Sequence, residues 1–304
     1  MLIGLDIGGT KIEGVSLAPA SFELLEKFRT PTPKEGYSAF LDAVITTIDR
    51  LCEEAQPLSI GIGCCGSINK DSGKMQGSNL LYLNGQDFIG DLKKHYALPI
   101  AVANDADCLA ISEFKSGAAK GADNSCIAVI IGTGCGSGVI INGDIVTGLN
   151  NLGGEMGHNP LPGYQTDTDG ENTTCYCGSI NCIESFCSGT GFERTYANKF
   201  SPLQAKAIFD LAADNDANAL AHIDLYCDQL ARSLASIINV IDPEIIVLGG
   251  GMSNQESIYP RVQDKLNQYT FSKTAKTQVV KAVHGDSSGV RGAAILPALK
   301  GLVS

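Results

Sequence analysis

Three cysteines and a histidine lie close enough along the chain to share one metal ion. Cys175, Cys177 and Cys182 form one tight cluster, and His158 lies upstream, directly after Gly157. Three thiolates and one imidazole suit tetrahedral Zn²⁺, and four protein ligands leave no open position for a reacting water. The cluster therefore predicts a closed, structural zinc site. The alternative is three buried free thiols in a reducing cytoplasm.

Glycine-rich turns indicate where a polyphosphate could bind. The stretch DIGGTK at 6–11 places Asp6 at the end of a predicted strand, followed by two glycines, a hydroxyl and an amine. The stretch GTGCGSG at 132–138 matches neither the Rossmann nor the Walker A motif. Glycines let backbone N–H groups approach phosphate oxygens, and Asp6 can hold Mg²⁺ through water. The alternative for 6–11 is an ordinary β-turn. A third run, GGG at 249–251, ends another predicted strand.

The elements that position these motifs alternate between strands and helices, which predicts an α/β fold with mainly parallel central strands. A strand, a glycine turn and a second strand occur twice, which suggests an internal duplication. A hinge is expected at 117–123 and a mobile loop at 163–174. Strands are predicted at 1–7, 11–17, 22–29, 59–64, 99–103, 125–131, 139–141, 244–248 and 279–283. Helices are predicted at 39–55, 104–114, 217–241 and 290–299.

The composition argues against several classes of protein. The 304 residues are 44% hydrophobic and 18% charged, which is typical of a folded chain long enough for two lobes. A net charge of −11 argues against a general nucleic-acid binder, which needs a basic face. No apolar run reaches the length of a membrane helix, and we expect no signal peptide. Eleven cysteines without an export signal indicate reduced thiols in the cytoplasm.

Jointly, the motifs resemble the ROK family of sugar kinases, within the actin-like ATPase (ribonuclease H-like) fold of two lobes around a cleft. The resemblance covers nearly the whole chain, and its stretches are DIGGTK (6–11), NDAD (104–107), GTGCGSG (132–138), GGEMGH (153–158), CYCGSINCIE (175–184), VLGGGMS (247–253) and HGDSSGVRGAA (284–294). We expect a small lobe at 1–117, completed by a C-terminal helix at about 290–304. The large lobe is expected at 118–289, with the zinc motif.

The resemblance implies how ATP is held. The first two glycine turns bind its phosphates, and the third glycine run lies against the adenosine. Mg²⁺ accompanies the nucleotide. The implied nucleotide-site residues are Asp6, Gly8, Gly9, Thr10, Lys11, Thr133, Gly134, Gly249, Gly250 and Gly251.

Asp105 is the residue expected to act as the catalytic base. Phosphoryl transfer needs an acceptor held in line and one group that takes the proton of the attacking hydroxyl. Asp105 lies at the start of a predicted helix, directly after a strand, which fixes its direction. The alternative is a helix N-cap aspartate, and without the other motifs that interpretation would be preferred.

In the family, the zinc ion shapes the sugar pocket and takes no part in the chemistry. Carboxylates near the zinc ligands can accept hydrogen bonds from sugar hydroxyls. His158 can serve twice, with one ring nitrogen on zinc and the other toward a hydroxyl. The sugar contacts that the resemblance implies are Asn79, Asn104, Asp105, Glu155, His158 and Glu184.

The chain departs from the family pattern at two places. Asn181 replaces the usual glycine before the third zinc cysteine, and asparagine tolerates the left-handed backbone that such a turn needs. Cys64-Cys65-Gly66 replaces the usual Gly-Pro-Gly, and the missing proline is expected to loosen a loop near the sugar.

The acceptor is expected to be a hexose, and the stretches at 78–88, 157–162, 175–178 and 188–192 are most similar to bacterial fructokinases and mannokinases of the family. The expected reaction converts D-fructose to fructose 6-phosphate, with mannose also accepted. N-acetylglucosamine kinase and glucokinase are the alternatives within the family, because a few pocket contacts decide between hexoses.

Proteins of other classes remain as alternatives. A sugar-binding ROK regulator would need an added DNA-binding domain, for which the predicted first strand leaves no room. A zinc hydrolase would need an open metal position, and a carbohydrate-binding module would not need Asp105 or the phosphate turns. The expected partners are therefore a sugar and ATP, without nucleic acid or membrane, in a homodimer.

Overall fold

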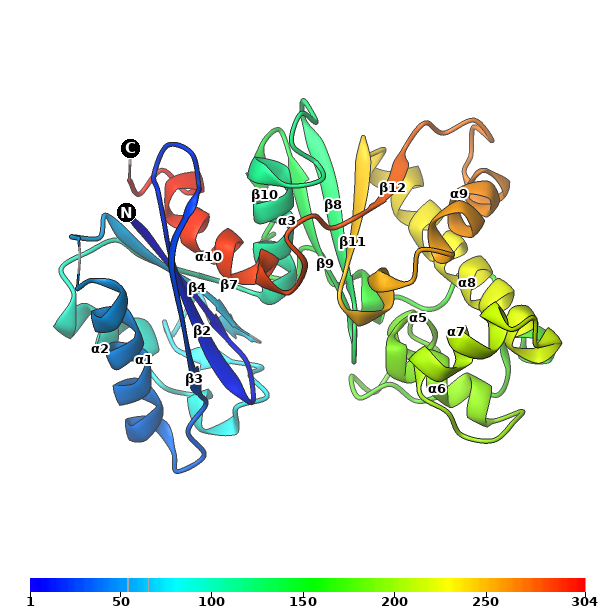
Figure 1. The fold of residues 1–304 in the computed structure, drawn as a ribbon, viewed down its shortest axis with the longest axis horizontal. Coiled ribbons are helices and arrows are strands. Elements are labelled where there is room, and N and C mark those ends of the chain that lie inside the picture. Colours follow the sequence, from blue (N-terminus) through cyan, green and yellow to red (C-terminus); the bar gives the residue numbers. More distant parts are fainter. Residues whose placement is uncertain (54, 65, 304) are drawn as a thin grey trace.

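Two mixed β-sheets form the frame of the molecule. The computed structural model describes residues 1–53, 55–64 and 66–303. The two sheets lie apart, and helices α3 (Asp105–Ser116) and α10 (Ser288–Leu299) lie between them (Figure 1). This arrangement confirms the predicted α/β class.

The first sheet has the strand order β3-β2-β1-β4-β7. β1 pairs antiparallel with β2 and parallel with β4, and β4 pairs parallel with β7. Its strands are β1 (Leu2–Ile7), β2 (Lys11–Leu17), β3 (Leu24–Pro31), β4 (Ser59–Cys64) and β7 (Ile100–Ala103). Helices α1 (Tyr37–Leu51) and α2 (Phe88–His95) cover one face. Phe40, Val44, Ile48 and Leu51 recur at helical spacing on α1 and are buried, which explains why this segment forms an amphipathic helix.

The second sheet repeats the first in order and direction. Its order is β10-β9-β8-β11-β12, with β8 antiparallel to β9 and parallel to β11. In both sheets the first strand is central, the second and third lie to one side, and the last two lie to the other. This repeat supports the duplication suggested by the two glycine turns. The strands are β8 (Ser125–Ile131), β9 (Cys135–Ile141), β10 (Asp144–Ile145), β11 (Ile245–Gly249) and β12 (Gln278–Lys281).

Close helix packing joins the two halves. A side chain at Gly61 of β4 would overlap the carbonyl of Ala293 in α10, and one at Gly292 would overlap the carbonyl of Cys108 in α3. Glycine at these positions lets the backbones touch. The last helix of the chain therefore packs against the first sheet.

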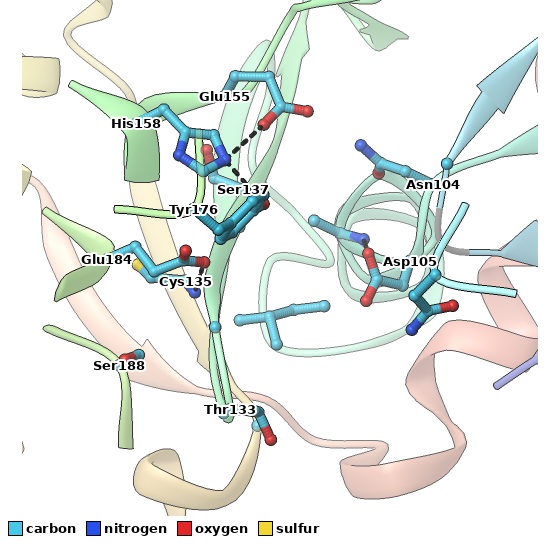
Figure 2. A pocket seen from close by; sticks show the side chains of 18 of the residues that line it. Asn104, Asp105, Thr133, Cys135, Ser137, Glu155, His158, Tyr176, Glu184 and Ser188 are labelled. Carbon is cyan, nitrogen blue, oxygen red and sulfur yellow. Dashed lines mark hydrogen bonds and ion pairs between the residues drawn. The ribbon is translucent and has the colours of Figure 1, made fainter. Parts of the chain in front are cut away.

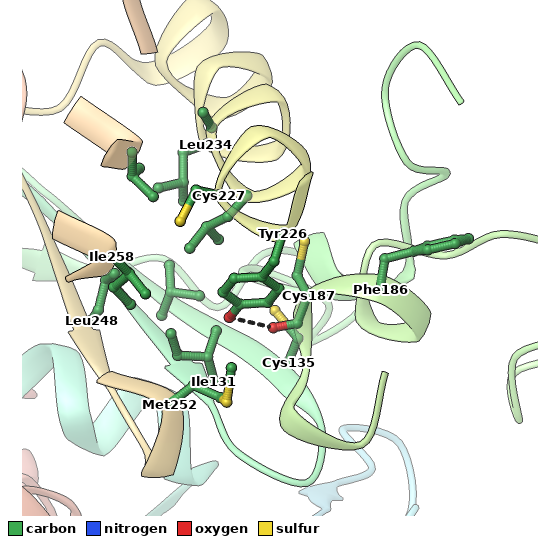
Figure 3. Packing of buried hydrophobic residues seen from close by; sticks show 14 of the residues in the cluster. Ile131, Cys135, Phe186, Cys187, Tyr226, Cys227, Leu234, Leu248, Met252 and Ile258 are labelled. Atoms are coloured by element: carbon green, nitrogen blue, oxygen red, sulfur yellow. Dashed lines mark hydrogen bonds between the residues drawn. The ribbon is translucent and has the colours of Figure 1, made fainter. Parts of the chain in front are cut away.

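The helices beyond the second sheet bury a separate core. Tyr226 of α8 lies at its centre, and its hydroxyl donates to the carbonyl of Cys187 at 3.0 Å (Figure 3). These helices are α5 (Glu184–Cys187), α6 (Gly189–Ala197), α7 (Ala205–Ala213), α8 (Ala217–Ile241) and α9 (Ile258–Tyr269). The predicted bounds of α8 are confirmed: Asp216 caps its N-terminus, and Asp242 ends it in the left-handed conformation.

Short elements complete the chain. A two-stranded sheet joins β5 (Ser67–Ile68) to β6 (Met75–Gln76). Single 3₁₀ turns lie at Leu81–Leu83, Met156–His158, Gly251–Asn254 and Gly285–Ser287. Within the described part of the chain, no helix has the length and apolar character needed to cross a membrane.

Some sequence predictions were wrong in part. The strand predicted from residue 22 begins at Leu24, because Phe22 lies in a turn with φ 56°. The glycine turn predicted at 132–138 ends early, because β9 already begins at Cys135 and α3 packs closely against Gly138. The predicted helix 39–55 ends at Leu51, and Glu54 lies outside the described residues.

The segment 163–174, predicted as a mobile loop, instead contains helix α4 (Thr166–Asp169). Asp169 is buried and accepts hydrogen bonds from Arg232 at 2.6 Å and Gln229 at 3.0 Å, both on α8. A buried ion pair was not visible in the local sequence, because its partner lies 63 residues away.

Candidate active site and metal centre

A cleft of about 1030 Å³ lies between the two halves of the molecule. Its walls combine the end of β1, the start of α3, the turn between β8 and β9, and the loop that carries the cysteine cluster. In Figure 2, Asn104 and Asp105 lie on one side, and Glu155, His158 and Glu184 lie on the other.

Asn104, and not Asp105, caps helix α3. The Asn104 side chain accepts a hydrogen bond from the backbone N–H of Asp107 at 2.6 Å. Asp105 is the first residue of the helix and is accessible within the cleft, where it accepts from the N–H of Ala106 at 3.0 Å. The alternative that Asp105 serves as the cap is therefore wrong.

Two acidic residues that line the cleft, Asp6 and Asp105, have raised pKa values. The protein atoms around Asp105 raise its pKa by desolvation, although its side chain stays accessible within the cleft. Burial, then the nearby charge of Asp105, raises the pKa of Asp6 to about 6. A cation between carboxylates such as these would relieve the repulsion, so Asp6 is chemically suited to Mg²⁺ that arrives with a nucleotide.

The first glycine turn, between β1 and β2, is fixed by hydrogen bonds to residues of the same half of the molecule. Gly8 donates its N–H to the carbonyl of Lys11 at 3.0 Å, and Thr32 donates its hydroxyl to the carbonyl of Gly8 at 2.7 Å. The Lys11 ammonium lies 3.2 Å from Glu13, which also pairs with Arg29. In this structure, Lys11 is therefore directed along its own strand, β2, toward Glu13 and does not line the cleft.

The second glycine turn is held against helices α5 and α6. Glu184 accepts a hydrogen bond from the N–H of Cys135 at 2.9 Å, and a side chain at Gly134 would come within 2.6 Å of the same carboxylate oxygen. Gly189 donates to the carbonyl of Gly132 at 2.7 Å, and Thr190 donates to Thr133 at 2.6 Å. The turn thus joins the cysteine loop to the start of α6.

The third glycine run closes the end of the cleft. Gly250 follows β11 with φ 82°, and a Cβ there would lie 2.8 Å from the backbone of Ile131. Both constraints require glycine. Gly250 lines the cleft, Gly249 is buried beneath it and Gly251 is exposed.

His158 faces the cysteine cluster with one nitrogen and the cleft with the other. Its Nδ1 lies 3.6 Å from Cys175 Sγ. Its Nε2 lies 3.0 Å from the Tyr176 hydroxyl and 3.9 Å from Glu155 Oε2 (Figure 2). This orientation is the one that a double role in metal and sugar binding requires.

The cysteine cluster fits a tetrahedral metal ion. The candidate ligand atoms of His158, Cys175, Cys177 and Cys182 all lie within 4.8 Å of one another. Cys177 Sγ and Cys182 Sγ are 3.6 Å apart, close to the ~3.8 Å edge of a tetrahedron with Zn–S bonds of ~2.3 Å. These residues would hold Zn²⁺ with four protein ligands, and such an ion would fix the loop.

The replaced glycine in this loop adopts the expected backbone. Asn181 has φ 58°, which confirms that asparagine supports the left-handed turn. Its side chain also accepts from the N–H of Thr173 at 2.8 Å and donates to Asn172 at 2.7 Å. The other departure involves Cys65, which lies outside the described residues.

The cleft brings together most of the predicted site residues from distant parts of the chain. The predicted residues in its wall are Asp6, Gly8, Asn79, Asn104, Asp105, Thr133, Gly134, Glu155, His158, Cys175, Glu184 and Gly250. The other predicted residues lie beside or beneath the wall, and they are Gly9, Thr10, Lys11, Gly249, Gly251, Cys177 and Cys182.

Sequence reasoning missed the contribution of α6. Ser188, Thr190 and Arg194 line the cleft beside the second glycine turn. Ser188 caps α6 by accepting from the N–H of Gly191 at 3.0 Å. A serine before a small-residue helix start was the available signal, but it did not show which turn the helix would touch.

Comparison with known proteins agrees with this geometry. Residues 2–299 match the model of the ROK family. An N-acetyl-D-glucosamine kinase from Photobacterium profundum is 34% identical over 305 residues, which cover 97% of this chain and 99% of that protein.

Solved structures show the same fold. The crystal structure of a ROK hexokinase from Thermus thermophilus matches with a TM-score of 0.84 and 29% identity, and the match covers 97% of each chain. A ROK family glucokinase from Streptomyces griseus, in complex with glucose and AMPPNP, matches with a TM-score of 0.78 and 25% identity over 97% of this chain and 98% of that one.

Proposed function

This chain belongs to the ROK family and is a sugar kinase, and on that premise we propose that it phosphorylates N-acetyl-D-glucosamine with ATP. The 34% identical relative that covers 97% of this chain bears this activity in its name. D-fructose, the acceptor expected from the sequence motifs, gains no support from that relative. The relative favours instead the N-acetylglucosamine kinase that stood as the alternative.

The observation that carries the mechanism is the accessible carboxylate of Asp105 in the cleft that joins the two glycine turns. The sugar hydroxyl attacks the γ-phosphorus of ATP, its proton passes to Asp105, and the bond to the β-phosphate oxygen breaks to release ADP. The 6-hydroxyl is the acceptor, because it is the primary hydroxyl of the pyranose. Asn79, Asn104, Glu155, His158 and Glu184 orient the sugar in this proposal.

The cofactors follow from the same site. Mg²⁺ would accompany ATP near Asp6, and His158, Cys175, Cys177 and Cys182 would hold a structural Zn²⁺. Gly8, Thr133, Gly134 and Gly250 line the nucleotide side. We also propose that the protein is cytoplasmic and forms a homodimer, and light scattering on the purified protein would test the dimer.

A comparison of acceptors tests the proposal. Initial rates are measured with N-acetylglucosamine, glucose, mannose and fructose at one saturating ATP concentration, and kcat/KM is compared. We expect N-acetylglucosamine to exceed each other sugar by at least tenfold, since pocket contacts worth ~1–3 kcal/mol separate such substrates. A higher kcat/KM for fructose would restore the fructokinase assignment. Binding of sugar without any phosphorylation would instead favour the sugar-binding regulator.

A further inference from the structure

A second cavity of about 420 Å³ lies behind the strand that leads to the proposed base. All four residues of β7 contribute to its wall, together with the last turn of α10 and the chain after it. Residues of the second half, among them Ile145, Thr147 and Gly153, close the other side. The cavity adjoins the active-site cleft, and the two share Ser67, Asn104 and Asn151 in their walls.

The cavity wall is mostly apolar but contains one buried acid. Branched side chains line it, and they include Ile68, Ile89, Ile100, Val102, Ile145 and Leu296. Among them lies Asp107, the third residue of α3, which is only 6% exposed. Its Oδ1 atom is buried and has no hydrogen-bond partner among the described residues. Most buried polar atoms in proteins have a partner, so this oxygen calls for a donor.

The charges around Asp107 favour a cationic donor. Burial raises the pKa of Asp107 to about 7; the exposed Lys300 at the rim lowers it, and the carboxylates of Asp105 and Glu155 raise it. A cation placed beside Asp107 would favour its charged form. Lys70, the other lysine in the wall, already donates to the carbonyls of Gly148 and Leu149.

We propose that this second cavity is a binding site for a small molecule that combines an apolar body with a protonated amine. The apolar body packs against the branched side chains, and the ammonium group donates to Asp107 Oδ1. Such charge-assisted hydrogen bonds are stronger than neutral ones. The proposal concerns a site outside the sugar and nucleotide subsites, and it does not depend on which hexose is the acceptor.

Ligand binding in the second cavity affects the active site, because residues of both halves of the molecule line this cavity. Hydrogen bonds that cross between the halves lie at its rim: Lys70 to Gly148 at 2.7 Å and Asn151 to Ile68 at 2.9 Å. A ligand held by both walls stabilises this relative position of the halves, and β7 runs directly into Asn104 and Asp105. By linkage, a bound amine and a bound sugar then change each other's affinity by the same factor.

A matched series of probes tests the chemistry. Phenethylamine, 2-phenylethanol and 3-phenylpropionate share an aromatic body and differ in the end group. Their binding to the full, zinc-loaded chain is measured by calorimetry in the presence of saturating N-acetylglucosamine and AMPPNP, so that the first cleft is filled. We expect the amine to bind at least tenfold more tightly than the alcohol and the acid to bind most weakly. Equal binding of the three probes, or none by the amine, overturns the proposal.

Two variants locate the binding. Thr147→Phe fills the cavity from a wall residue that does not line the first cleft, and it should abolish amine binding, whereas the matched Thr147→Ser should retain it. Asp107→Asn should remove the advantage of the amine over the alcohol. If Asp107→Asn does not fold, the Thr147 pair decides alone: amine binding that persists in Thr147→Phe places the site elsewhere and refutes the proposal. Kinase assays are not needed for this decision, so a wrong acceptor assignment leaves it intact.

Discussion

At the scale of single residues, two neighbouring side chains have separate roles: Asn104 caps helix α3, and Asp105 is the proposed catalytic base. Asn104 satisfies the helix end by accepting from Asp107 N–H. Asp105 keeps its carboxylate in the cleft with a raised pKa. A carboxylate with a raised pKa is a stronger base, which suits the removal of a proton from a hydroxyl.

Asp105→Asn should lower kcat by about 10²–10⁴-fold, the usual contribution of a positioned general base. The amide has nearly the same size, so the dissociation constants of sugar and AMPPNP should change little. Steady-state kinetics and calorimetry on the same preparation check both statements. A variant with turnover close to the original would remove Asp105 from the mechanism.

Asp6 should limit stability at neutral pH. Its pKa is about 6 in the folded protein against an ordinary value of 3.8, mainly because of burial. The protonated acid therefore favours the folded state below about pH 4, and this contribution is lost as the pH rises through 6. Asp6→Asn should raise the free energy of unfolding by roughly 1–3 kcal/mol at pH 8.

The gain from Asp6→Asn should shrink as the pH falls below 6 and vanish near pH 4. Urea unfolding at several pH values measures it. A gain independent of pH would mean that the carboxylate charge is not its cause. Activity should fall in the same variant, because the proposed Mg²⁺ partner is lost.

At the scale of elements, the cysteine loop connects the metal site to both substrates. Glu184 follows the last cysteine closely and accepts from Cys135 N–H in the second glycine turn. His158 turns its other nitrogen toward Glu155. Loss of the metal should therefore disturb both the proposed sugar-binding residues Glu155, His158 and Glu184 and the second glycine turn.

Chelation should lower the melting temperature and the kinase activity in parallel, and added Zn²⁺ should restore both. Cys177→Ser should reduce the bound zinc measured by atomic absorption; Cys177 is exposed, so little packing is lost. Cys52→Ser is the matched control, since Cys52 lies on another element and should leave the zinc content unchanged. Full activity of zinc-free protein would contradict the proposed link between the metal site and the sugar-binding residues.

At the scale of the whole molecule, the buried carboxylate of Glu113 accepts hydrogen bonds from both segments of the chain that pass between the halves. Glu113 accepts from the N–H of Ala118 at 2.7 Å, just after α3. It also accepts from Val283 at 3.0 Å, from His284 at 3.2 Å and from the Ser288 hydroxyl at 2.7 Å. The predicted hinge at 117–123 is therefore anchored at its first residues by a side chain outside it.

Glu113→Gln should destabilise the fold by about 1–3 kcal/mol, because an amide nitrogen replaces one acceptor and leaves buried donors unsatisfied. Glu244→Gln is the control: Glu244 also accepts from backbone N–H groups, at Asp123, Asn124 and Ser125, but it is exposed. Chemical denaturation should show a much smaller loss for Glu244→Gln. Equal losses would argue against a special role for Glu113 at the crossing.

The sequence by itself determined the local features of this protein. Apolar periodicity predicted α8 correctly, and the repeated strand–glycine turn–strand pattern suggested an internal duplication, which the two sheets of the same order support. The spacing of Cys175, Cys177 and Cys182 predicted a cluster that the structure assembles with His158. These features depend on residues near one another in the chain.

Only the tertiary structure decided which distant residues meet. It paired Asp169, in the segment predicted as a loop, with Arg232 of α8. It also placed α6 against the second glycine turn and directed Lys11 toward Glu13. It also put Asp107 Oδ1, which has no hydrogen-bond partner in the part of the chain that the structure describes, in a cavity between the halves. A local pattern records how an element buries its apolar face, whereas a contact between elements depends on packing and on the loss of water from both partners at once.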